Sequence, residues 1–152
     1  MARIQLLVFE VGNREFAIDA ESANGILRAK KFTIQKLPGN DQRIDGMINL
    51  RGKIIYLFNL CSKLDIPHRE ISPESKIVLV QVSEGSVGFI VDEVNDIVRF
   101  DTDEIEPAPF FVSAKDAQYI SGVGKIDERL LVILKLDHLL SVEELESLPE
   151  SV

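Results

Sequence analysis

The apolar residues of this chain concentrate around one stretch, residues 46–60. Two apolar runs, residues 47–50 and 54–58, flank the dipeptide Arg51-Gly52. Glycine at the second position of a two-residue turn adopts a positive φ without steric cost, so the pattern predicts a tight β-hairpin. The second run is rich in β-branched and aromatic residues and too short for a good helix, which predicts a strand buried on both faces. Arg51 lies at the tip of this hairpin, where a solvated turn residue is the simplest interpretation.

The first residues predict another hairpin. Residues 3–11 alternate imperfectly between two apolar faces, and residues 15–18 form a second short apolar segment. Gly12-Asn13 between them is a turn signal. Two short antiparallel strands therefore open the chain.

Short helical segments are expected at three places. Asp19 is an N-cap candidate followed by helix formers, so one or two helical turns are predicted for residues 19–24, ending at Gly25. Residues 60–64 fit a single helical turn. A capping-box pattern predicts a last short helix over residues 141–148.

The sequence also repeats itself weakly. Residues 65–75 are polar, hold two prolines and interrupt the apolar pattern, which makes them the best internal boundary. Segments before this boundary match segments after it. The matched segments are 6–11 with 77–82 and 16–28 with 87–99 at an offset of 71 residues, and 44–64 with 120–140 at an offset of 76.

This duplication predicts an all-β fold with short helices, built as two tandem five-stranded barrels within a single domain of residues 1–152. The first pseudo-repeat covers about residues 4–64, the linker about 65–75 and the second pseudo-repeat about 76–140. Because a half of roughly 70 residues buries little core alone, we expect the halves to share a hydrophobic core.

Composition and charge narrow the function. The chain of 152 residues has a formal net charge of −8, and its longest basic cluster is residues 28–31, so a nucleic-acid partner is not expected. A single cysteine, Cys61, cannot form an internal disulfide and follows an apolar run, so we expect a small buried side chain. Without a signal peptide or an apolar run near the roughly 20 residues that span a bilayer, we expect a soluble cytoplasmic protein.

Candidate chemical motifs fail on inspection. Residues 121–125 resemble a phosphate loop but lack its first glycine and the hydroxyl residue after the lysine. The acidic segment 101–106 lacks the glycine and final glutamate of a calcium loop. The two histidines, His68 and His138, lie apart from any ligand set, so neither a metal site, nor a cofactor, nor a catalytic centre is expected.

A series of separated motifs resembles the CheW family, the coupling proteins of bacterial chemotaxis arrays, and the resemblance covers about residues 5–148. The most specific segments are 46–60, 88–94 and 105–109, and segment 119–124 followed by 130–134 is a further match. The resemblance implies two five-stranded SH3-like barrels with a hydrophobic core between them. It also implies a non-enzymatic adaptor that couples chemoreceptor tips to the regulatory domain of the histidine kinase CheA.

The resemblance implies two sets of binding residues. The receptor-binding positions are Arg51, Asn49, Ala23, Ile26, Val94 and Val98. The kinase-binding positions are Leu37, Pro38, Asp45 and Gly46. The apolar members also fit a purely structural role in the core, and Pro38 and Gly46 also fit a role in shaping loops.

Two positions depart from the family pattern. Tyr56 stands where family members usually have proline, so a backbone N–H is available there. Gly25 stands where members often carry an acidic side chain thought to face the receptor. This departure weakens the implied receptor contacts at that corner.

Two other functions stay open. A CheW-like scaffold in a different kinase pathway, such as one for pili or surface motility, would use the same fold. A small enzyme using carboxylates such as Asp92 and Glu93 is the alternative from another class. We expect the free protein to be a monomer that is recruited to membrane-associated receptor arrays without entering the membrane.

Overall fold

The computed structural model describes residues 3–37, 44–61, 64, 66–82, 85–107 and 120–135. Its strands are β1 (Arg3–Val11), β2 (Arg14–Asp19), β3 (Ala23–Arg28), β4 (Ile44–Leu50), β5 (Lys53–Asn59), β6 (Lys76–Val82), β7 (Gly85–Val91), β8 (Glu93–Asp101), β9 (Ile105–Glu106), β10 (Ile120–Ile126) and β11 (Arg129–Leu134). Three 3-10 helices, η1 (Ala20–Ser22), η2 (Ala29–Lys31) and η3 (Thr102–Glu104), are the helical segments of the described chain. The all-β prediction is confirmed.

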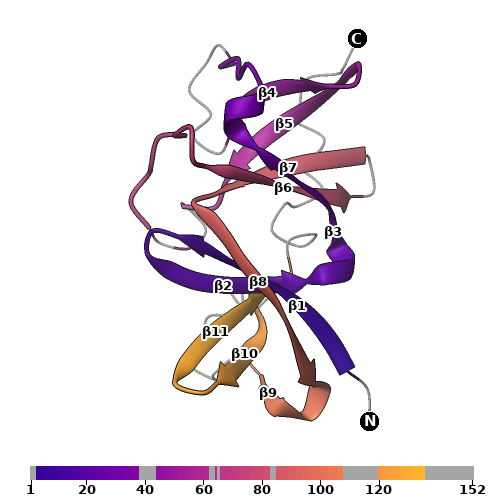
Figure 1. Cartoon of the computed structure of the whole chain (residues 1–152), viewed down its shortest axis with the longest axis vertical. Coiled ribbons are helices and arrows are strands. Elements are labelled where there is room, and N and C mark those ends of the chain that lie inside the picture. Colours follow the sequence, from indigo (N-terminus) through magenta and orange to yellow (C-terminus); the bar gives the residue numbers. More distant parts are fainter. Residues whose placement is uncertain are drawn as a thin grey trace.

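The strands form two sheets that lie at opposite ends of the molecule (Figure 1). One sheet has six strands in the order β8-β1-β2-β11-β10-β9, and the other has five in the order β3-β6-β7-β5-β4. Neighbouring strands are antiparallel except for two parallel pairs, β2 with β11 and β5 with β7. Both predicted hairpins are present, as β1–β2 and β4–β5.

Each sheet takes strands from both halves of the chain, so the sheets are not contiguous in sequence as two tandem units would be. At the offsets of the predicted repeat, β1, β2 and β3 correspond to β6, β7 and β8, and β4 and β5 correspond to β10 and β11. Exchanging each strand for its counterpart converts the order β8-β1-β2-β11-β10 into β3-β6-β7-β5-β4. The parallel pairs keep the same register, since Leu57 opposite Gly88 corresponds to Ile133 opposite Ala17. This agreement supports the duplication, whose boundaries stay a prediction.

The two sheets, each built from strands of both halves, bury three hydrophobic clusters. The six-stranded sheet encloses a small core that includes Leu6, Val8 and Phe100. The five-stranded sheet encloses another, which includes Ile55, Leu57 and Ile77. The largest cluster, the shared core, lies between the sheets and draws its side chains from both. Its buried members are Leu7, Phe9, Val11, Phe16, Ile18, Tyr56, Phe58, Leu60, Cys61, Ile66, Val78, Val80, Val87, Phe89, Val91 and Leu134.

The central strands are buried on both faces, which explains their continuous apolar runs. In β5, Ile55 and Leu57 enter the core of the five-stranded sheet, while Tyr56 and Phe58 enter the shared core. The prediction of a strand buried on both faces is confirmed for residues 55–58.

The helical prediction for residues 19–24 is wrong beyond one turn. Asp19 accepts a hydrogen bond from the backbone N–H of Glu21 and caps η1, which ends at Ser22. Ala23 then begins β3, and Gly25 lies inside that strand rather than at a helix end. β3 pairs along one edge with β6, whose partner residues are 48–57 positions away in the sequence and are not revealed by local helix signals.

Two further segments were predicted to be helical. The backbone N–H of Leu64 donates to the carbonyl oxygen of Leu60 at 3.0 Å, as a single helical turn at residues 60–64 requires. The helix expected over residues 141–148 lies outside the described residues.

We expect Phe58→Ala to lower the free energy of unfolding by about 3–5 kcal/mol, because it opens a cavity in the shared core. The Phe58 side chain is 2% exposed, and its ring centroid lies 6.1 Å from that of Phe89. Chemical denaturation measures the loss. The control Ile97→Ala removes an isoleucine that is 59% exposed and should change stability by no more than about 0.5 kcal/mol. Equal losses in the two variants would contradict the assignment of this core.

Candidate protein-binding site

The hairpin tip between β4 and β5 holds Arg51, the predicted receptor-binding cation, in a constrained turn. Arg51 and Gly52 have φ values of 53° and 87°, the left-handed geometry of a two-residue hairpin turn whose twist matches the strands. The backbone N–H of Gly52 donates to Oδ1 of Asn49 at 2.8 Å, which stabilises the turn from the preceding strand. The Arg51 side chain is exposed and forms no ion pair with any described residue. Asn49 therefore shapes the turn, and Arg51 projects from it.

The other predicted receptor-binding residues lie on the two equivalent edge strands, β3 and β8. Ala23 and Val94 pack against the shared core, one from each strand. Val98 packs instead against the core of the six-stranded sheet. Ile26 is 45% exposed and belongs to none of the buried clusters, so it is the apolar member most available to a partner.

The predicted kinase-binding residues are mostly inward-facing where they are described. Leu37 packs against the shared core. Gly46 is buried, and a Cβ there would lie 2.7 Å from the carbonyl oxygen of Gln35, so glycine allows the chain before β4 to cross it closely. Asp45 has a side chain only 9% exposed. Pro38 lies outside the described residues.

Asp45 is held by two polar neighbours. Its Oδ1 accepts from Nδ2 of Asn59 at 3.1 Å and lies 3.1 Å from Nε2 of His68. Its Oδ2 is buried and has no hydrogen-bond partner within the described part of the chain. This contact fastens the segment before β6 to the start of β4, a link that the isolated position of His68 in the sequence did not reveal.

The candidate chemical groups serve structural contacts. Cys61 is buried as expected, and burial raises the pKa of its thiol. Oδ2 of Asp92 accepts from the backbone N–H of Gly12 at 2.9 Å and lies 3.4 Å from Nε of Arg69. Among the described residues, no group of three or more His, Cys, Asp or Glu side chains is arranged to hold a metal ion. Nor does that part of the chain include a helix with the length and hydropathy needed to cross a membrane.

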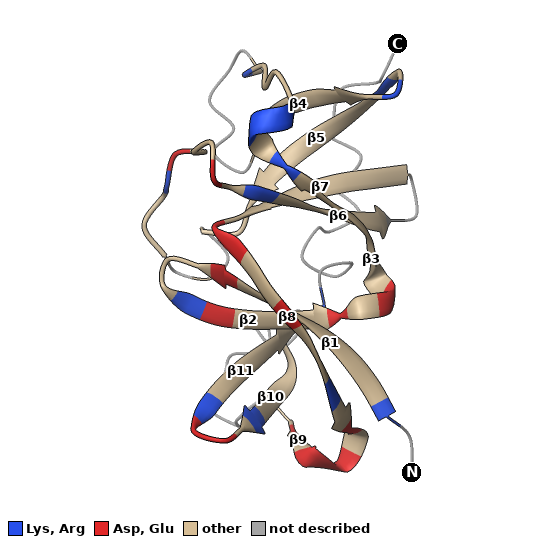
Figure 2. Ribbon diagram, viewed as in Figure 1, with Lys and Arg blue, Asp and Glu red and all other residues tan. Residues whose placement is uncertain are grey.

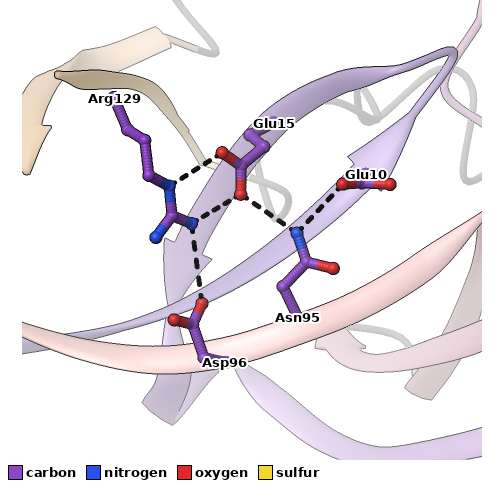
Figure 3. Close-up of polar contacts among 5 residues, drawn as sticks. All are labelled: Glu10, Glu15, Asn95, Asp96 and Arg129. Atoms are coloured by element: carbon purple, nitrogen blue, oxygen red, sulfur yellow. Dashed lines mark hydrogen bonds and ion pairs between the residues drawn. The ribbon is translucent and has the colours of Figure 1, made fainter.

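A polar network on the six-stranded sheet was not predicted from the sequence (Figure 3). Arg129 of β11 binds Glu15 of β2 through two hydrogen bonds, from Nε to Oε1 at 2.9 Å and from Nη2 to Oε2 at 2.6 Å. Nη2 also lies 3.8 Å from Oδ1 of Asp96 in β8. The Asn95 amide donates to Glu15 at 3.0 Å and to Glu10 at 3.3 Å. These contacts connect strands β1, β2, β8 and β11.

The network determines how Glu15 titrates. The two hydrogen bonds from the Arg129 guanidinium lower the pKa of Glu15 below its ordinary 4.5, with a further contribution from Asn95. Glu15 likewise raises the pKa of Arg129. Glu15 and Arg129 are 114 residues apart, so only their strand positions bring them together.

The fold defines a small β-sheet scaffold, and the exposed members of the predicted receptor-binding set include Arg51 at a hairpin tip and Ile26 on an edge strand. Comparison with known proteins agrees. Residues 5–144 match the CheW-like domain family. Chemotaxis protein CheW of Bacillus subtilis is 34% identical over 94% of this chain and 90% of its own length. Its counterpart in Klebsiella aerogenes is 28% identical over 93% of this chain and 84% of its own length.

A solved structure shares the fold closely. The scaffolding protein TtCheW from Thermoanaerobacter tengcongensis superposes with a TM-score of 0.81 at 30% identity, covering 94% of this chain and 96% of that one. The chain therefore belongs to the CheW family. Membership makes it a non-enzymatic scaffolding protein of chemotaxis, as the sequence motifs implied.

We expect Glu15→Gln to lower the free energy of unfolding by about 0.5–1 kcal/mol at pH 7, the range of a partly exposed ion pair. Because the folded-state pKa of Glu15 lies below its unfolded value, the pair stabilises the protein fully above pH 4.5 and loses this effect as the pH falls through the lowered pKa. Denaturation of wild type and variant across this range measures the difference. The exposed control Glu106→Gln should show no such pH-dependent difference, and a difference for Glu15→Gln that persists in strong acid would contradict this role of the ion pair.

Proposed function

We propose that this chain couples the cytoplasmic tips of chemoreceptors to the regulatory domain of the histidine kinase CheA. Family membership supports the adaptor role, and the geometry of Arg51 is the observation that supports this specific function. The receptor tip is a helical hairpin, whose amphipathic face binds through apolar contacts and a few polar ones. Arg51, Asn49, Ala23, Ile26, Val94 and Val98 form the proposed receptor-binding set.

Arg51 occupies a left-handed backbone conformation that favours glycine. Left-handed φ values cost a residue with a Cβ about 1 kcal/mol relative to glycine. Arginine is present here although its side chain is exposed and makes no ion pair within the described chain that could offset this strain. Strain at an exposed cation without an internal partner is what a recognition residue at a rigid tip would show.

The kinase would bind at the end of the five-stranded sheet near Leu37, Pro38, Asp45 and Gly46. Gly46 and Asp45 contribute there through the backbone they shape, because Gly46 is packed against Gln35 and the carboxylate of Asp45 is engaged by Asn59 and His68. A related β domain of the kinase can pack against this end as one sheet domain on another. Head-to-tail contacts of this type close into rings when the rotation between subunits permits.

Location follows from this role. The protein would be cytoplasmic, a monomer when free, and held at the membrane only through the receptor array. A net charge of −8 supports the monomeric state through mutual repulsion of the copies.

Calorimetric titration with the kinase regulatory domain, and then with a receptor-tip fragment, tests the proposal. Independent binding to both is the expected result. Binding to the kinase domain alone would overturn the receptor half of the proposal, and binding to neither would overturn the chemotaxis partnership and favour a different kinase pathway.

We expect Arg51→Ala to weaken receptor-tip binding by about tenfold or more while changing the thermal midpoint little, because the exposed side chain forms no ion pair with another described residue. Arg51→Gly should weaken binding equally yet hold or raise the midpoint, since glycine relieves the left-handed strain. The matched control Arg14→Ala removes an exposed arginine from the β1–β2 hairpin and should leave affinity unchanged. A large loss of stability in Arg51→Ala would assign Arg51 a structural role instead.

A further inference from the structure

The internal repeat gives the molecule two equivalent groups of surface residues, here called the first and second corners, which differ in charge. The second corner is the network of Figure 3, formed by Glu10, Glu15, Asn95, Asp96 and Arg129. The first corner is the set of positions that correspond to them at the offsets of 71 and 76 residues, Gln81, Ser86, Asn24, Gly25 and Lys53.

The backbone frames of the two corners agree. β3 has a bulge at Asn24, between the pairs of Ala23 with Val80 and Gly25 with Leu79. β8 has a bulge at the corresponding Asn95, between the pairs of Val94 with Phe9 and Asp96 with Val8. The asparagine amides also donate to equivalent partners, Asn24 to Gln81 at 3.4 Å and Asn95 to Glu10 at 3.3 Å. Differences between the corners therefore come from their side chains.

The first corner has a cation, Lys53, but no acid at the positions of Glu15 and Asp96. Arg129 is neutralised by Glu15 and Asp96. In the first corner serine and glycine replace these two residues, and Ser86 donates to Gln81 at 3.2 Å. Lys53 is exposed and forms no ion pair with any described residue.

The chain cannot easily supply the missing acid at Gly25. Its φ is 143°, a conformation that side chains rarely adopt, and among the described residues the only heavy atom within 4 Å of an added Cβ is Cδ1 of Leu79 at 3.5 Å. The space that Asp96 fills in the second corner is thus open in the first. Ile26, which follows Gly25, is 45% exposed beside it.

The two equivalent hairpin tips also differ in charge. Arg51 and Asp127 occupy corresponding positions with φ values of 53° and 52°, so the same turn carries a cation in one half and an anion in the other. Figure 2 shows basic residues at the β4–β5 turn and acidic residues at the β10–β11 turn.

We propose that the first corner is a carboxylate-binding subsite. An aspartate or glutamate of the receptor tip enters the space left by Gly25 and pairs with Lys53, while an apolar side chain beside it contacts Ile26. The subsite rests on the proposed function and specifies the chemistry of its partner. A phosphate-rich polyanion is disfavoured because the chain carries a net charge of −8.

The test compares Lys53→Gln with the wild type in titrations against a receptor-tip fragment and the kinase domain. We expect receptor affinity to fall about 3- to 10-fold and kinase affinity to stay unchanged. The loss should shrink at high salt, because screening weakens the ion pair in the wild type. Lys125→Gln, which neutralises an exposed lysine on β10, is the control and should bind normally.

Ser86→Glu adds an internal acid at the position of Glu15. We expect it to pair with Lys53, to fold with an unchanged or higher thermal midpoint, and to lose receptor affinity at least as strongly as Lys53→Gln. Replacing each tip Asp and Glu by its amide should then identify one acid whose removal weakens binding to wild type but not to Lys53→Gln.

The outcomes separate the two proposals. If the wild type binds the receptor tip and Lys53→Gln binds equally well, or no tip acid couples to Lys53, the subsite is overturned while the proposed function stands. If the wild type fails to bind the tip, the receptor-coupling function is overturned and the subsite with it.

Discussion

The shared core between the two sheets is the constraint on which the rest of the structure depends. The central residues of strands such as β1, β5 and β6 alternate their side chains between this core and the core of their own sheet, so neither face of these central segments meets solvent. Neither sheet could expose its half of the shared core to water without leaving a large apolar surface unburied. The two sheets therefore form one structural unit, and many residues of the edge strands β3 and β8 and of the hairpin tips stay exposed.

Strand exchange between the halves strengthens this coupling. β3 leaves the hairpin that precedes it and completes the sheet of β6 and β7, while β8 does the reverse and pairs with β1. The chain crosses from one sheet to the other at η1, between β2 and β3, and at Asp92, between β7 and β8. Ala23 and Val94 follow these crossings and pack at the margin of the shared core. A scaffold benefits from such rigidity, because partner contacts made at separate surfaces keep a defined relative orientation.

The two halves of the chain share one backbone arrangement but present different surface side chains. The bulges, the parallel pairs and the left-handed hairpin turns recur in both halves, but the side chains that they present have diverged. In one half an arginine is satisfied internally by acids, and in the other a lysine and an arginine are left exposed. An adaptor that must distinguish two partners requires this kind of asymmetry, because identical surfaces would bind both partners alike.

The sequence by itself determined the fold class and much of the element order. Apolar runs too short for helices predicted buried strands, and Gly12-Asn13 and Arg51-Gly52 marked tight turns, because these signals depend on local backbone geometry and burial. The family motifs also indicated the adaptor class and marked Arg51, which the structure places in an exposed hairpin turn.

Only the tertiary structure decided the partners of the strands and the polar contacts. The cap at Asp19 is a local signal and predicted a helix, but the helical segment ends at Ser22 and the following residues pair as β3 with β6. Glu15 meets Arg129, and Asp45 meets His68, through strand neighbours that are distant in sequence. Side-chain periodicity reports how deeply a strand is buried, whereas its neighbours are selected by the closure of both sheets around a common core, which is a property of the whole chain.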